Sequence, residues 1–303
     1  MRKYLIISPH LDDAVLSCGA SMAHWASEGN EVVVATVFTS CGDYSDGMNA
    51  LYKKRRQQDR EAIAKLGCKH IHLGFIDAPF RNNNYHNFST ILFHHETVED
   101  DFDDLKEKIE QSIKSLIDSF CPDNLLFPLG VGGHIDHNIV YWSSLQVAPL
   151  VRQLTYYEDL PYAFVPGWSL IRRAKVGISI LLEEVQSFTK AASPVPLDHI
   201  ALPFLQNYVV DTEDKATSNQ KYEEELYYLK SIADGSLTHI LTGNHLKFEE
   251  ATHQEEFFSA KCEAIKAYKT EWPALFGNEE NNIGTVLHPN PTLPYFERFW
   301  KIN

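Results

Sequence analysis

The chain has 303 residues, of which 44% are hydrophobic and 22% are charged, as in a typical soluble globular protein. Its net charge of −14 argues against nucleic acid or an anionic membrane surface as the main partner. No apolar run approaches the ~20 residues of a membrane span, and no signal-peptide pattern precedes the first strand. The five scattered cysteines are typical of free thiols. We therefore expect a cytoplasmic protein.

The first half of the chain alternates strand and helix signals. Apolar runs predict strands over residues 4–7, 31–38, 70–73, 124–128 and 154–158, and periodic segments between them predict helices over 12–28, 50–66, 101–120 and 138–147. The segment 78–99 is rich in Asn and His, which is typical of an ordered surface loop. Repeated strand–helix units predict a doubly wound, mostly parallel α/β sheet flanked by helices.

Beyond residue 160 the alternation weakens. Helices are predicted over 216–233 and 255–268, the segment 170–188 mixes both patterns, and the end of the chain is rich in aromatic residues. Neither a repeat nor a flexible linker separates the two halves. We therefore expect a single domain, in which residues 1–160 form the core and residues 161–303 pack on that core and wall a substrate pocket.

Two adjacent aspartates and a histidine lie where the first strand ends and the first helix begins, in the stretch His10-Leu11-Asp12-Asp13. Ligands bind at this position in open α/β sheets. Polar groups gathered so closely are unfavourable unless something pairs them, and a metal ion is the simplest partner. The alternative interpretation is that Asp12 caps the helix, Asp13 interacts with its dipole and His10 has a local partner.

A second polar cluster, His134-Ile135-Asp136-His137, follows the fourth strand through a glycine-rich turn. It therefore lies at the same edge of the sheet as the first cluster. Histidine and aspartate side chains suit zinc and leave a position open for water, and Gly132-Gly133 allows the backbone to approach a metal or a substrate closely. Each histidine alone could be an exposed or capping residue, but two clusters at matching strand ends favour a metal site.

These two clusters resemble the P-H-P-D-D-E and H-x-D-H motifs of the PIG-L/LmbE-like zinc N-deacetylases. The resemblance covers residues 4 to about 158 and implies a Rossmann-like α/β fold that hydrolyses N-acetyl groups, mostly on amino sugars and their conjugates. Leu11 stands for the usual Pro and Ala14 for the usual Glu. The form of the first motif is similar to the branch found in natural-product pathways.

The resemblance assigns a role to each polar residue of the two motifs. The zinc ligands would be His10, Asp13 and His137; iron(II) could fill the same ligands. Asp12 would be the general base that takes a proton from the water, and His134 would stabilise the oxyanion or protonate the leaving amine. Asp136 would orient a neighbouring histidine from outside the ligand set.

Three further positions are candidates for the pocket. Arg55 matches a substrate-contacting arginine of the family's R-x-x-E segment, although Gln58 stands at the acidic position; its alternative is a solvated helix charge. Asp77 follows the third strand and could bond a sugar hydroxyl or merely cap a loop. Glu158 and Asp159 end the fifth strand and could support a ligand histidine.

We therefore predict a zinc-dependent hydrolase that removes an N-acyl group, most simply acetyl, from an amino sugar or a glycosylated small molecule. One alternative is an amidase acting on a larger thiol or sugar conjugate. A non-catalytic Rossmann-like module for a metal or a nucleotide is a second alternative, but the first turn lacks G-x-G-x-x-G. A magnesium phosphoryl-transfer site would leave His10 and His137 without a role. The oligomeric state stays open, a homo-oligomer included.

Overall fold

The structure is a computed structural model that describes residues 1–303 except 82, 94–101, 179, 192–194, 209–211, 237–245, 278–281, 289, 291 and 303. The end of the predicted loop 78–99 and the first residue of the predicted helix 101–120 lie outside the described residues. None of the described helices is long and apolar enough to cross a membrane.

A seven-stranded sheet organises the fold, with strand order β3-β2-β1-β4-β5-β7-β6. The strands are β1 (Lys3–Ser8), β2 (Glu31–Ser40), β3 (Lys69–Ile76), β4 (Asn124–Pro128), β5 (Leu154–Tyr157), β6 (Lys247–His253) and β7 (Tyr295–Lys301). The first five strands are parallel, and β7 pairs antiparallel with both β5 and β6. The predicted doubly wound α/β fold is confirmed, and all five predicted strands are present.

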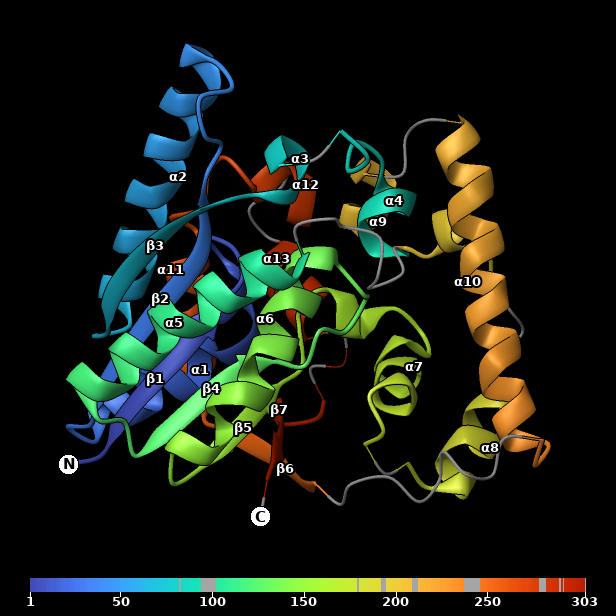
Figure 1. The fold of residues 1–303 in the computed structure, drawn as a ribbon. Helices are drawn as coiled ribbons and strands as arrows, with labels where there is room; N and C mark the ends of the chain where they lie inside the picture. Colours follow the sequence, from blue (N-terminus) through green and yellow to red (C-terminus); the bar gives the residue numbers. More distant parts are fainter. Residues whose placement is uncertain are drawn as a thin grey trace.

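Helices cover both faces of the sheet, as β1 and β2 require because their apolar runs are buried along almost their whole length. The helices that connect the parallel strands are α1 (Asp13–Ser27), α2 (Asp46–Lys65), α5 (Phe102–Phe120) and α6 (Ile135–Val147). Figure 1 shows α1 and α2 on one face and α5 and α6 on the other. This arrangement is what right-handed crossovers in both directions produce.

The direction of winding reverses between β1 and β4, which are hydrogen-bonded neighbours in register at Leu5–Leu125. From β1 the chain proceeds to β2 and β3, whereas from β4 it proceeds to β5 on the other side. The loops that leave β1 and β4 therefore diverge and open a crevice at the carboxyl ends of the strands. Both predicted polar clusters follow these two strands.

Several elements differ from the predictions, and three of the differences lie near the crevice. Helix α2 begins four residues earlier, at Asp46, because the Ser45 side chain accepts a hydrogen bond from the Met48 N–H and caps it. The segment predicted as a loop contains two short helices, α3 (Ala78–Arg81) and α4 (Phe88–Leu92). Helix α6 begins at Ile135, which makes His134 its N-cap.

The second half both packs on the sheet and extends it. Sequence reasoning missed β6 and β7, whose residues pair along seven positions at the edge of the sheet. The other elements among the described residues of this half are α7 (Trp168–Lys175), α8 (Leu182–Ala191), α9 (Pro203–Tyr208), α10 (Thr212–Ala233), α11 (Glu255–Ile265), α12 (Trp272–Phe276) and α13 (Asn282–Leu287), with short 3-10 turns at Tyr162–Phe164 and Leu197–His199. A further 3-10 turn, Ala148–Leu150, follows α6 in the first half. Figure 1 shows α7, α8 and α10 grouped beside the sheet.

Candidate metal and catalytic site

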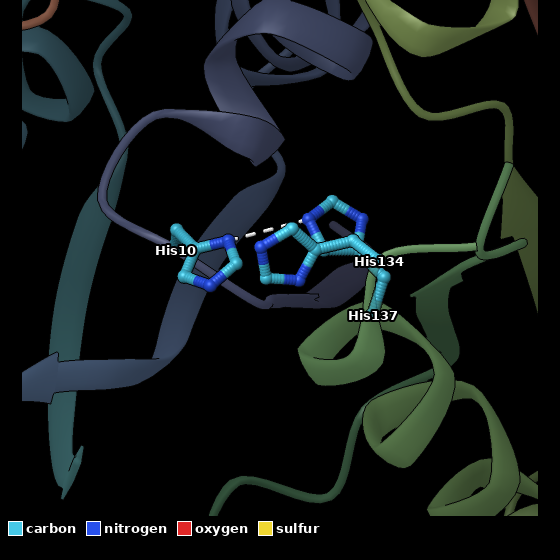
Figure 2. A group of neighbouring side chains, drawn as sticks. All are labelled: His10, His134 and His137. Carbon is cyan, nitrogen blue, oxygen red and sulfur yellow. Dashed lines mark hydrogen bonds between the residues drawn. The ribbon is translucent and has the colours of Figure 1, made fainter. Parts of the chain in front are cut away.

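Three side chains from the two polar clusters meet at the crevice. The Nδ1 of His10, the Oδ2 of Asp13 and the Nε2 of His137 form a triangle in which each side is 3.2 Å. Figure 2 shows His10 facing His134 and His137 across the crevice. In a tetrahedral zinc site with bonds of about 2.0–2.1 Å, ligand atoms lie about 3.3 Å apart. The three predicted ligands are therefore brought together at the spacing of a metal site.

Carboxylates hold the outer nitrogens of both histidines. His10 contacts the Oδ2 of Asp136 through Nε2 at 3.1 Å, and His137 contacts the Oδ1 of Asp159 through Nδ1 at 2.7 Å. An imidazole that donates its outer N–H to a carboxylate presents the lone pair of its other nitrogen to the centre. The two rings are thus oriented toward the same point.

Each of these carboxylates is itself fixed. The Oδ2 of Asp159 accepts hydrogen bonds from the backbone N–H groups of Gly130 at 2.7 Å and Val131 at 2.8 Å. Asp136 is fully buried, pairs with the Arg81 guanidinium at 2.7 Å and accepts from the Ala78 N–H at 3.0 Å. Burial of these charges is tolerable because every one of them is paired.

The prediction that Glu158 supports a ligand histidine is wrong; Asp159 occupies that place. Glu158 accepts a hydrogen bond from the Ser169 hydroxyl and lies 3.7 Å from the Arg298 guanidinium. The physical reason is that successive residues at the end of a strand point to opposite sides. Residue type and position could not show which of the two acids faces His137.

The electrostatics of the cluster favour positive charge at its centre. Burial alone would lower the pKa of His10, but the carboxylates of Asp77, Asp13 and Asp136 outweigh burial and raise it. The pKa of His137 is raised to about 9 against the effect of burial, chiefly by Asp13. The pKa of Asp13 is lowered, despite burial, by His137 and His10. A metal cation supplies the charge that this arrangement stabilises.

Two other groups also have the spacing of metal ligands among the described residues. They are His10, His134 and His137, and His10, Asp77 and Asp136. We favour the triangle that contains Asp13, because the carboxylate of Asp136 is already paired with a guanidinium. In addition, the Nδ1 of His134 accepts a hydrogen bond from the backbone N–H of Asp136 at 3.2 Å, so this nitrogen is already engaged.

Asp12 and His134 stand beside the triangle and line the same pocket. Burial and the neighbouring Asp13 carboxylate raise the pKa of Asp12 to about 8, so this carboxylate can exchange a proton near neutral pH. Burial, His10 and His137 lower the pKa of His134 to about 3. His134 is therefore neutral, and because its Nδ1 accepts a hydrogen bond, its proton resides on Nε2, where it can be donated.

The pocket has a volume of about 500 Å³, and these polar groups are part of its lining. Both predicted substrate-binding residues line it: Arg55 is 3.8 Å from Asp77, whose carboxylate also accepts from the Tyr52 hydroxyl. Glu271 from the second half lies 2.9 Å from Arg55 and completes this charged wall. The opposite walls are apolar and include Phe88, Ile91 and Leu92 of α4, Phe204 of α9 and Leu275 of α12.

Sequence reasoning missed Arg81 and Glu271. Neither residue belongs to a motif, and both come from segments without a clear periodic pattern. One feature could have indicated a residue such as Arg81: a buried carboxylate such as that of Asp136 needs a cationic partner. Gln58 accepts hydrogen bonds from the N–H and hydroxyl of Thr270, which fixes the residue before Glu271.

The fold and the site together define a Rossmann-like α/β protein with a His/Asp metal-type centre at the switch point of its sheet. Residues 5–148 match the family described as GlcNAc-PI de-N-acetylase, PIG-L. All the motif residues of the site up to His137 lie inside the match.

Two curated relatives are named as 2′-N-acetylparomamine deacetylases. A 2′-N-acetylparomamine deacetylase of Niallia circulans is 26% identical over 189 residues, covering 53% of this chain and 68% of that protein. A 2′-N-acetylparomamine deacetylase of Streptomyces fradiae is 29% identical over 167 residues, covering 52% of this chain and 57% of that protein. The similarity in sequence therefore extends over about half of this chain.

Solved structures share the fold over almost the whole length. The zinc-inhibited form of the teicoplanin deacetylase Orf2 has a TM-score of 0.62 at 23% identity, covering 99% of this chain and 97% of that one. The A40926 pseudoaglycone deacetylase Dbv21 has a TM-score of 0.58 at 24% identity with the same coverage. The arrangement of the second half is thus shared with these structures.

Proposed function

We propose that this protein is a zinc-dependent N-deacetylase that removes an acetyl group from the amine of an amino sugar or a glycosylated small molecule. The single observation that carries the proposal is the triangle of His10, Asp13 and His137 with Asp12 and His134 in the same pocket. The natural-product deacetylases among the relatives support this choice of chemistry. Iron(II) is the alternative metal for the same ligands.

His10, Asp13 and His137 would hold the metal, with Asp136 and Asp159 fixing the two imidazoles. A bound zinc ion lowers the pKa of a coordinated water and polarises the amide carbonyl. The two neutral nitrogens and one carboxylate leave a position free for this chemistry, as in other catalytic zinc sites. The acidic surroundings that raise the pKa values of the two histidines support the binding of a cation.

Asp12 takes a proton from the attacking water as the new C–O bond forms. His134 donates a hydrogen bond from Nε2 as negative charge develops on the carbonyl oxygen. Collapse of the tetrahedral species breaks the C–N bond, and the proton held by Asp12 passes to the leaving amine. The products are the protonated amine and acetate, because the acetic acid released gives its proton to the amine, so atoms and charge balance.

The shape of the pocket supports a sugar as the substrate. Asp77 and Arg55 can bond ring hydroxyls, and the apolar walls can receive the acetyl methyl or an attached aglycone. An amidase acting on a larger thiol or sugar conjugate would use the same catalytic residues. The assay below separates the two activities by varying the acyl group.

We propose a cytoplasmic location, which is supported by the five cysteines, because all of them are free thiols. We propose a small N-acetylated molecule as the partner, in keeping with a pocket of this size.

The test joins metal analysis to an amine-release assay. The purified protein is assayed on a panel of N-acetylated amino sugars and glycosides, and on analogues with longer acyl groups, before and after chelation and after addition of zinc. We expect activity that is lost on chelation and restored by zinc. In Asp12→Asn we expect a loss of about 10²–10⁴-fold in kcat, with Asp46→Asn at the exposed start of α2 as a matched control. Full activity after chelation, or wild-type turnover by Asp12→Asn, overturns the proposal.

A further inference from the structure

A second cavity of about 550 Å³ adjoins the candidate active site. The two cavities share Leu92 as a wall. On the far side of this residue, the second cavity is lined by the Gly132-Gly133 turn that leads into His134, by Trp168 of α7 and by Tyr228 of α10. The second cavity therefore lies between α7, α10 and the turn that leads into His134. Figure 1 shows α7 and α10 beside the sheet.

The lining combines aromatic rings with paired charges. Lys175 lies 2.5 Å from Glu225, and Lys221 lies 3.5 Å from Glu224. Phe93, Trp168 and Tyr228 contribute aromatic surface to the same cavity. A polyhydroxylated ring meets both requirements, because its C–H faces pack on aromatic rings while its hydroxyls bond charged side chains. The paired charges do not select a strongly charged ligand.

A buried acceptor in the lining lacks a partner. Asn138 is 3% exposed, and its Nδ2 donates to the Gly133 carbonyl at 2.9 Å, which fixes the orientation of the amide. Its Oδ1 has no hydrogen-bond partner among the described residues. An unsatisfied buried acceptor is unfavourable, and a hydroxyl group of a ligand would satisfy it. The Asn138 backbone N–H also bonds the carbonyl of His134 at 2.9 Å, so the cavity and the catalytic turn share this residue.

From these observations we propose that the second cavity is a binding subsite for a further sugar ring of the substrate. The inference rests on the proposed function and narrows it: the preferred substrate is a glycoside of at least two rings. The N-acetylated ring occupies the site of His10 and Asp12, and the next ring lies beyond Leu92 against Tyr228 and Asn138.

Two adjacent tyrosines of α10 supply a matched test. Tyr228 lines the cavity, whereas Tyr227 is 72% exposed and is not among the lining residues. The variants Tyr228→Ala and Tyr227→Ala are assayed on N-acetylglucosamine, which has one ring, and on 2′-N-acetylparomamine and N,N′-diacetylchitobiose, which have two. We expect Tyr228→Ala to raise KM for a two-ring substrate about five- to tenfold without changing KM for the single ring. Tyr227→Ala leaves both unchanged.

Equal kcat/KM for one-ring and two-ring substrates in the wild-type protein overturns the inference, as does a Tyr228→Ala variant that affects both classes alike or neither. Calorimetric titration of the zinc-loaded protein with the same compounds separates this failure from failure of the proposed function. Two-ring compounds that bind more weakly in Tyr228→Ala than in Tyr227→Ala support the subsite even where no amine is released. Identical binding by the two variants contradicts it.

Discussion

The imidazole of His137 and the carboxylate of Asp159 lie 2.7 Å apart. His137 belongs to the first turn of α6, which follows β4, and Asp159 follows the neighbouring strand β5. The carboxylate is fixed by two backbone N–H groups of the turn that follows β4. Asp159, which belongs to neither motif, thus holds the His137 ring so that Nε2 points to the candidate metal site.

We predict that Asp159→Asn weakens zinc binding about 10–100-fold, because the amide orients the imidazole less strongly and leaves it less basic. The adjacent Glu158→Gln is the matched control, since Glu158 contacts Ser169 and Arg298 instead. Competition with a chromophoric zinc chelator measures both affinities. Equal affinities for the two variants would mean that Asp159 does not support the site.

Replacement of His134 separates a catalytic histidine from a ligand. Because Nδ1 of His134 accepts the Asp136 N–H and the side chain lines the pocket beside the triangle, we expect His134→Ala to retain one zinc ion per chain. Its kcat should fall about 10²–10³-fold through loss of the hydrogen bond to the oxyanion. Elemental analysis beside kinetics checks both statements. Loss of the metal from this variant would favour the grouping of His10, His134 and His137 as ligands.

How much of the candidate site could be predicted from the sequence depends on where each of its residues lies in the fold. The meeting of the two clusters that contain His10, Asp13 and His137 was predictable because parallel strands bring their carboxyl ends to one edge. The choice of these three residues as ligands came from the resemblance to a family. Asp159 could not be told from Glu158, because the choice depends on how the chain turns at the end of β5. Glu271 comes from a segment more than two hundred residues away from Arg55, and local pattern carries no information on such a contact. Among the described residues, β6 pairs with β7 and β7 pairs with β5. The alternation of buried and exposed residues in β6 and β7 depends on these pairings, which the sequence does not show.

Acid stability should report on a buried ion pair that joins the second half to α1. Glu297 of β7 lies 2.8 Å from the Lys261 ammonium and accepts the backbone N–H groups of Ala20 and Ser21. Although burial opposes ionisation, Lys261 and His253 lower the pKa of Glu297 from 4.5 to about 2. A lowered pKa in the folded state stabilises the protein fully above the unfolded value, and this stability is lost as the pH falls from about 4.5 toward about 2.

The shift corresponds to roughly 3 kcal/mol at neutral pH. We expect the difference in free energy of unfolding between wild type and Glu297→Gln, measured in urea, to be largest near pH 7. Below pH 4.5 the difference should shrink, because the wild-type carboxylate becomes protonated. A difference that stays constant from pH 7 to pH 3 would contradict this role.

The turn before His134 has no room for a side chain. Gly133 has a φ of +75°, and a Cβ at this position would lie 2.6 Å from the Leu92 carbonyl oxygen. We predict that Gly133→Ala lowers kcat about 10²-fold by displacing His134, and destabilises the fold by about 1–3 kcal/mol. Gly177→Ala is the control, because Gly177 has a similar φ of +70° with no atom within 4 Å. Similar kinetics for the two variants would show that the close approach to Leu92 is unimportant.

The most direct test of the central claim is the position of the metal itself. Crystals of the zinc-loaded protein, measured on both sides of the zinc absorption edge, locate the ion by anomalous scattering. We predict one ion bound by the Nδ1 of His10, the Oδ2 of Asp13 and the Nε2 of His137. An ion between His10, Asp77 and Asp136, or the absence of any ion from the crevice, would contradict the claim.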